Sequence, residues 1–115
     1  MILTGKAKEE FFNWLDNQGV NGIDISNWEF EKFHLLSNVS QNSLIIEWFD
    51  SVEIYINIEP YIGGGDVVFY FGVINRRADF IDEHYSSAND DIYFGTRQEA
   101  LTEAIKKANE IYNSK

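Results

Sequence analysis

Residues 53–74 read EIYINIEPYIGGGDVVFYFGVI, and the first half of this stretch alternates between polar and apolar side chains. Ile54, Ile56 and Ile58 would face one side of a strand and the intervening residues the other, which is the pattern of a half-buried strand. The second half, residues 67–74, is apolar on nearly both faces, as a central strand would be. Two such runs joined by a short connection predict an antiparallel β-hairpin.

The connection between the two runs, PYIGGGD at residues 60–66, contains the single proline of the chain and three consecutive glycines. Proline has no backbone N–H to donate to a sheet, so we expect Pro60 to end the first strand. A phosphate-binding loop would carry its glycines between a strand and a helix, with lysine and then serine or threonine following. Here a strand follows, and Asp66 would repel a phosphate. The glycines at 63–65 are therefore predicted to turn the hairpin within a loop of about six or seven residues.

Helical periodicity precedes the hairpin in two places. Residues 5–17 are predicted to form a helix with Thr4 as its N-cap. Within residues 40–52 the central LII would suit a buried strand, but over the longer window the apolar residues recur with the spacing of one helical face, so we predict a helix there. The segment between these two helices is expected to pack a short helical turn over the core through Trp28, Phe30 and Phe33.

Strand and helix signals also follow the hairpin. The apolar pair Phe80 and Ile81 could extend the sheet, and residues 91–95, DIYFG, are predicted to form a short third strand. Thr96 then begins a final helix with TRQE. This is a capping-box sequence, in which the side chains of Thr96 and Glu99 would each bond to the backbone N–H of the other residue.

The final helix has one apolar face and one charged face. We expect Glu103 to pair with Lys107 on the outside. The core face is expected to consist of Leu101, Ala104, Ile105, Ala108 and Tyr112. The sequence thus predicts a single small α+β domain over residues 1–115. Its antiparallel β-sheet, a hairpin plus a short strand, would be packed with two N-terminal helices and a C-terminal helix.

Composition limits the classes of protein that fit. The chain has 115 residues, of which 44% are apolar, and it contains no cysteine, which excludes disulfides and cysteine metal sites. No apolar run approaches a signal peptide or a membrane span, so we expect a soluble, cytoplasmic protein.

The formal net charge is −10. Lys32 is the only lysine or arginine between Lys8 and Arg76, while acidic residues recur from Glu9 to Asp66. Such a surface disfavours direct binding of DNA or RNA and would attract a basic protein surface. An acidic surface that only keeps a small protein soluble is an equal alternative.

Several side chains are candidates for chemistry. One loop set has the ligand types of a hard metal ion without the spacing of a calcium loop, namely Asp79, Asp82, Glu83, His84, Asp90 and Asp91. His34 is read as a structural histidine, and Arg76 and Arg77 would point to opposite faces of a strand. No nucleophile, base and stabiliser can be assembled, so we expect no enzyme, no cofactor and no metal.

The outward face of the hairpin is the candidate for binding a partner protein. Tyrosines within an acidic rim make a plausible interface, because aromatic residues anchor contacts and charge sets the choice of partner. A helix covering this face, or a homodimer through it, is the alternative. The candidate residues are Glu53, Tyr55, Asn57, Glu59 and Tyr70, with Glu47 and Asp50 from the preceding helix.

Three segments, LTGKAKEEFFNWL, FDSVEIYINI and GTRQEALTEAIKKANEIYN, resemble a loose family of small bacteriophage and prophage proteins of unknown function. The chain departs from that pattern at Glu53, where a glycine turn is usual. The resemblance implies the same order of helices and hairpin, and it implies the company of anti-defence inhibitors such as the anti-CRISPR proteins. We therefore expect a non-enzymatic inhibitor that binds a basic, nucleic-acid-binding surface of a bacterial defence nuclease. The alternative is a phage accessory or assembly protein that acts through homo-oligomerisation.

Overall fold

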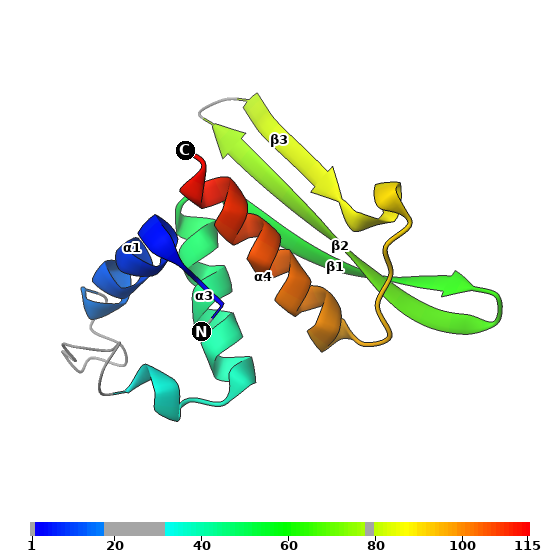
Figure 1. Cartoon of the computed structure of the whole chain (residues 1–115), viewed down its shortest axis with the longest axis horizontal. Coiled ribbons are helices and arrows are strands. Elements are labelled where there is room, and N and C mark those ends of the chain that lie inside the picture. Colours follow the sequence, from blue (N-terminus) through cyan, green and yellow to red (C-terminus); the bar gives the residue numbers. More distant parts are fainter. Residues whose placement is uncertain (1, 18–31, 78–79) are drawn as a thin grey trace.

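The computed structural model describes residues 2–17, 32–77 and 80–115. Its elements in chain order are α1 (Gly5–Asp16), η2 (Phe33–Leu35), α3 (Asn38–Ser51), β1 (Ile54–Gly63), β2 (Asp66–Arg77), β3 (Phe80–Ser86), η3 (Ser87–Asp90) and α4 (Arg97–Asn113). In this part of the chain the strands form one antiparallel sheet in the order β1-β2-β3, and the long helices lie on one side of it (Figure 1). The predicted α+β fold is confirmed.

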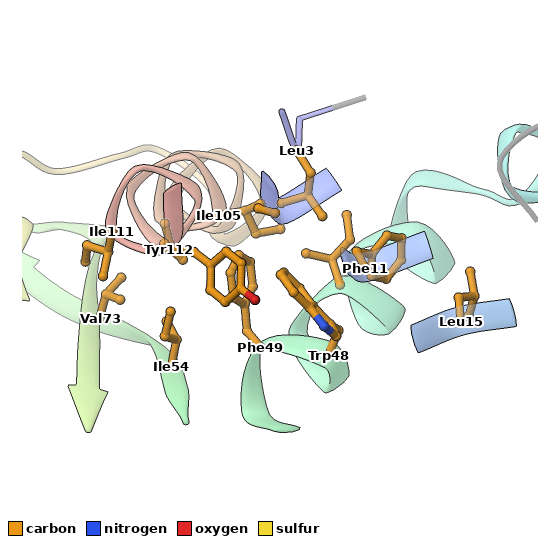
Figure 2. Close-up of a cluster of buried hydrophobic side chains, with 14 of the residues drawn as sticks. Leu3, Phe11, Leu15, Trp48, Phe49, Ile54, Val73, Ile105, Ile111 and Tyr112 are labelled. Atoms are coloured by element: carbon orange, nitrogen blue, oxygen red, sulfur yellow. The ribbon is translucent and has the colours of Figure 1, made fainter. Parts of the chain in front are cut away.

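The core lies between the helices and one face of the sheet (Figure 2). Trp48 of α3 is at its centre, with its ring centroid 5.9 Å from that of Phe11 in α1 and 4.9 Å from that of Tyr112 in α4. Ile54 of β1 and Val73 of β2 are fully buried against them. The segment at residues 40–52 is therefore helical as predicted. The apolar face of α3 packs against α1, α4 and the sheet.

The first helix is capped by the end of the last one. Thr4 is the N-cap residue, as predicted, but its side chain makes no capping hydrogen bond. Instead, Asn113 Oδ1 accepts from the Ala7 N–H at 2.8 Å. Asn109 Oδ1 accepts from the Thr4 N–H at 3.0 Å, and its Nδ2 donates to Thr4 Oγ1 at 3.0 Å. Two asparagines of α4 thus satisfy backbone groups that α1 leaves unpaired.

The final helix begins at the predicted cap residue, but one predicted ion pair differs. Thr96 Oγ1 accepts from the Glu99 N–H at 3.1 Å, as a cap requires. Glu103 pairs with Lys106 at 3.1 Å and not with Lys107 as expected. Positions i+3 and i+4 are both neighbours on a helix, and Lys107 lies 4.6 Å over the ring of Tyr85 instead.

Pro60 does not end β1, contrary to the prediction. The strand continues to Gly63, with Pro60 paired opposite Phe69. The N–H and C=O of Phe69 both bond to Phe94, at 2.8 Å each, and so are directed away from β1. Backbone groups alternate in direction along an antiparallel pair, so the position of Pro60 faces the open edge of the sheet. A proline there costs the ladder no hydrogen bond.

The hairpin loop is shorter than predicted, although the glycines do turn it. Gly63 pairs with Asp66 as the last step of the ladder, so only Gly64 and Gly65 form the turn. Their φ angles are 61° and 91°, which glycine adopts without strain.

The third strand lies earlier in the chain than residues 91–95. It is β3, which pairs with β2 through the register Val73–Tyr85 and carries an irregularity beside Asn75. The suggested extension of the sheet at Phe80 and Ile81 is therefore correct. Residues 91–95 contribute only an isolated bridge, Phe94 to Phe69. Of the aromatics expected to pack between the first two helices, Phe33 is buried in η2. Trp28 and Phe30 lie outside the described residues.

Candidate functional site

One face of the sheet is not covered by a helix within the described residues. Ile54 is buried under the helices, and Ile56 and Ile58 pack against the same core. Successive side chains of a strand point to opposite faces, so the residues of β1 between these isoleucines must face the opposite side of the sheet. We call this side the outer face; on β1 it comprises Tyr55, Asn57, Glu59 and Tyr61. In Figure 1, α1, α3 and α4 all lie on the other side of the sheet.

Four of the candidate residues meet on the outer face. Glu59 is directly opposite Tyr70 in the register, and Tyr55 is opposite Ile74. Asn57 Nδ2 donates to Glu59 Oε1 at 2.9 Å, which orients the carboxylate along the strand. Tyr55 is 38% exposed. The outer face therefore combines phenol groups with a carboxylate.

Two further tyrosines join this face toward the tip of the hairpin. The rings of Tyr61 and Tyr93 are stacked, with centroids 5.2 Å apart and planes inclined by 27°. Tyr70 meets Tyr93 nearly at a right angle, with centroids 6.2 Å apart. We call Tyr61, Tyr70 and Tyr93 the three-tyrosine cluster.

Sequence reasoning found only Tyr70 of this cluster. Tyr61 was missed because the strand was expected to end at Pro60; the same alternation extended past the proline would have found it. Tyr93 has no comparable signal. Its side chain reaches the outer face because the next residue, Phe94, bridges to Phe69 and packs toward the core.

The electrostatic setting of the cluster is acidic. Partial burial raises the pKa of Tyr93 above its ordinary value, and Tyr61, Asp91 and Tyr70 raise it further in that order. The phenol of Tyr93 therefore stays protonated and uncharged at neutral pH, and the Asp91 carboxylate lies close enough to influence it.

Glu53 lies at the junction of α3 and β1 with an unusual backbone conformation. Its φ is 62°, in the left-handed region that favours glycine. Its N–H donates to Asp50 O at 3.1 Å, and its C=O accepts from the Arg76 N–H at 3.0 Å. Its carboxylate lies 3.9 Å from Arg76 Nη1, with both side chains nearly half exposed. Glu53 thus lies in the connection between α3 and β1, and its side chain remains at the surface.

The remaining candidates for partner binding lie elsewhere. Glu47 and Asp50 are exposed on α3, in the helical layer, and so do not share the outer face. The predicted set of residues is therefore divided between the outer face, the junction at Glu53 and the helical side.

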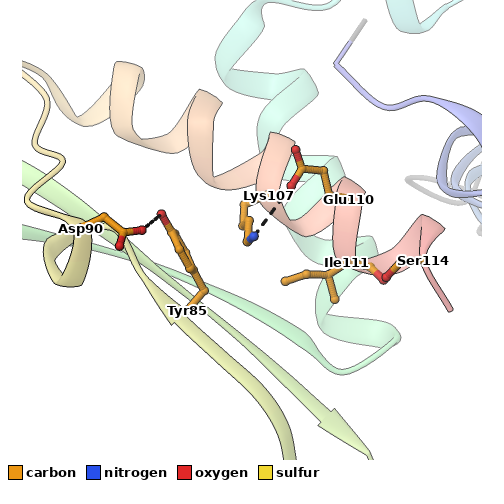
Figure 3. A network of polar contacts seen from close by, with 6 residues as sticks. All are labelled: Tyr85, Asp90, Lys107, Glu110, Ile111 and Ser114. Carbon is orange, nitrogen blue, oxygen red and sulfur yellow. Dashed lines mark hydrogen bonds and ion pairs between the residues drawn. The ribbon is translucent and has the colours of Figure 1, made fainter.

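The candidate metal ligands are dispersed. Asp82, Glu83 and His84 belong to β3, and Asp90 Oδ2 accepts from the Tyr85 hydroxyl at 3.0 Å (Figure 3). Asp79 lies outside the described residues. Among the described residues, no three side chains of these ligand types gather as a metal ion would require. His34 is exposed in η2.

A groove of about 290 Å³ lies between α4 and β3, on the side of the sheet that the helices occupy. Tyr85 and Lys107 face each other across it, and Lys107 is also 3.8 Å from Glu110 (Figure 3). Burial raises the pKa of Tyr85, and the hydrogen bond to Asp90 adds to that effect. Tyr85 is therefore a neutral hydrogen-bond donor whose ring is already covered by the chain's own lysine.

Comparison with known proteins adds no relative. No family model matches the chain, and neither a curated protein nor a solved structure matches it significantly. In the described part of the chain, none of the helices combines the length and the apolar character needed to cross a membrane.

Proposed function

We propose that this protein binds another protein through the outer face of its sheet and acts as a stoichiometric, non-enzymatic inhibitor. The observation that carries the proposal is the open outer face itself. It presents tyrosines beside carboxylates on a chain of net charge −10, and no helix covers it within the described residues. Aromatic residues supply contact area at low entropic cost, while the surrounding charge steers association.

The partner that fits this surface is basic. Proteins that bind nucleic acids expose clustered lysine and arginine, and an acidic protein can occupy the same surface. The resemblance to phage proteins narrows the partner to a defence nuclease of the host, such as a CRISPR effector. The inhibitor would then act in the cytoplasm of the bacterial cell and would not itself bind DNA.

A titration of nuclease activity tests this proposal. A purified CRISPR effector with its guide RNA would cleave a target DNA in the presence of increasing amounts of the protein. Inhibition should saturate near an equimolar ratio and weaken steeply between low and moderate salt. Inhibition at far substoichiometric amounts would contradict stoichiometric binding and indicate an enzyme.

Homo-oligomerisation in a phage assembly role is the second candidate, and the tip of the hairpin favours it. Ile62 and Val67 form a cross-strand pair there and are 76% and 55% exposed. Figure 1 shows this tip reaching beyond the helices. Two copies that carry the same net charge repel each other, so self-association should strengthen as salt is added. Binding to a basic partner should instead weaken as salt is added. Sedimentation of the protein, alone and with the partner, at two salt concentrations therefore separates the two candidate functions.

A further inference from the structure

The three-tyrosine cluster presents ring faces in an acidic setting. Tyr61 and Tyr93 are nearly parallel, and Tyr70 stands almost perpendicular to Tyr93. Tyr61 is 48% exposed, whereas Tyr70 and Tyr93 are half-buried, so solvent reaches the cluster mainly at Tyr61. The face of an aromatic ring carries partial negative charge, and a cation placed over it is attracted.

Carboxylates flank the cluster. Glu59 lies two residues before Tyr61 on the same face of β1 and directly opposite Tyr70. Asp91 lies two residues before Tyr93 in the chain, and its side chain is exposed. Within the described residues, neither carboxylate forms an ion pair with a lysine or arginine of this chain. A cation over the tyrosines would therefore find a carboxylate within reach.

Other aromatic rings of the protein already hold a cation of the chain. Arg97 lies 5.0 Å over Phe69, and Lys107 lies 4.6 Å over Tyr85. Tyr112 has Lys6 at 5.7 Å and Lys115 at 5.3 Å. The rings of the three-tyrosine cluster have no such partner among the described residues. The cluster thus has the surroundings of a cation site, and the chain itself does not fill it.

We propose that the three-tyrosine cluster is a subsite for an arginine side chain. That this arginine belongs to the inhibited protein rests on the proposed function above. A planar guanidinium can stack on a tyrosine ring and donate hydrogen bonds to a neighbouring carboxylate at the same time. A lysine ammonium is a compact, strongly hydrated charge that cannot stack in this way, so arginine should bind better than lysine.

Blocked tri-arginine and tri-lysine peptides test the subsite without the partner. Each peptide would be titrated into the isotope-labelled protein, and the amide and tyrosine ring resonances would be followed by NMR. Tri-arginine should bind more tightly than tri-lysine and should shift the resonances of Tyr61, Tyr70 and Tyr93. Tyr93→Leu should weaken tri-arginine binding by about two- to fivefold, in line with the strength of exposed cation–π contacts.

Matched variants separate the subsite from general attraction by net charge. Phe80→Leu removes an exposed aromatic ring of β3 that belongs neither to the cluster nor to the candidate interface residues, and it should leave the affinity unchanged. Tyr61→Leu repeats the test at a more exposed ring if Tyr93→Leu does not fold. Equal affinities for the two peptides, with no effect of either cluster variant, would overturn the inference.

The two proposals can fail separately. Inhibition of a nuclease that persists in a folded Tyr93→Leu variant with undiminished affinity would overturn the arginine subsite and leave the proposed function standing. Tri-arginine bound at the cluster by a protein that inhibits no nuclease would support the subsite and overturn the proposed function.

Discussion

Replacing Glu53 by glycine should stabilise the protein. Glu53 adopts φ 62°, and in the described residues Asp91, with φ 57°, is the only other non-glycine residue with a positive φ. An L side chain in this region costs about 1 kcal/mol relative to glycine, because its Cβ crowds the neighbouring carbonyl oxygen. Glu53→Gly removes that strain without changing the backbone path.

The loss of the glutamate side chain opposes this gain only weakly. The carboxylate lies 3.9 Å from Arg76, and the two side chains are 43% and 45% exposed. Exposed pairs of this kind contribute about 0–0.5 kcal/mol. The net change in the free energy of unfolding should be a gain of about 0.5–1 kcal/mol, which corresponds to a rise in Tm of about 2–5 °C.

Urea denaturation followed by circular dichroism measures this change, with Glu53→Gln as the matched control. The glutamine variant keeps the strained backbone and loses only the charge, so it should be equal to the wild type or less stable by up to about 0.5 kcal/mol. If Glu53→Gly were no more stable than Glu53→Gln, the left-handed backbone would not be a source of strain, and the reasoning would be refuted.

Three further changes probe the caps, the turn and the pH response. Asn113→Ala should lower the free energy of unfolding by about 1–2 kcal/mol in urea, because it leaves the Ala7 N–H without its acceptor; an unchanged midpoint would contradict the cap. Gly64→Ala should cost about 1 kcal/mol through its φ of 61° alone, since an added Cβ would meet no atom within 4 Å, and partner binding per folded molecule should stay intact. The pKa of Tyr85 is raised in the folded state, so the stability linked to its neutral form is complete below about pH 10 and is lost as the pH rises through its folded pKa. Tyr85→Phe should therefore lose less stability than the wild type between about pH 9 and pH 11, and parallel declines would exclude that linkage.

The elements that local periodicity and turn chemistry specify could be predicted from the sequence. The helix over residues 40–52 followed from the spacing of its apolar residues, and the hairpin followed from strict alternation and glycines. The end of β1 could not be predicted from Pro60 by itself. A proline interrupts a ladder only where its N–H would have been used, and the direction of that N–H depends on the register with Phe69.

Contacts between distant parts of the chain were beyond local reasoning. Thr4 is the N-cap residue, as its sequence position suggests, but the side chain that accepts from the first turn belongs to Asn113 at the other end of the chain. The candidate site shows the same limit. Tyr55 and Glu59 follow from the alternation of β1, whereas Tyr93 reaches the outer face only through the bridge between Phe94 and Phe69.

The central claim is that the outer face, and not the acidic surface as a whole, binds a basic protein. Two charge reversals on the two sides of the molecule test it. Glu59→Lys changes the outer face beside the three-tyrosine cluster, and Glu47→Lys makes the same change in net charge on the exposed side of α3. Calorimetry with a purified CRISPR effector nuclease would give the affinity of each variant. We predict that Glu59→Lys weakens binding about tenfold or more, while Glu47→Lys changes it less than about threefold. Equal effects of the two variants, or no binding by the wild type, would contradict the claim.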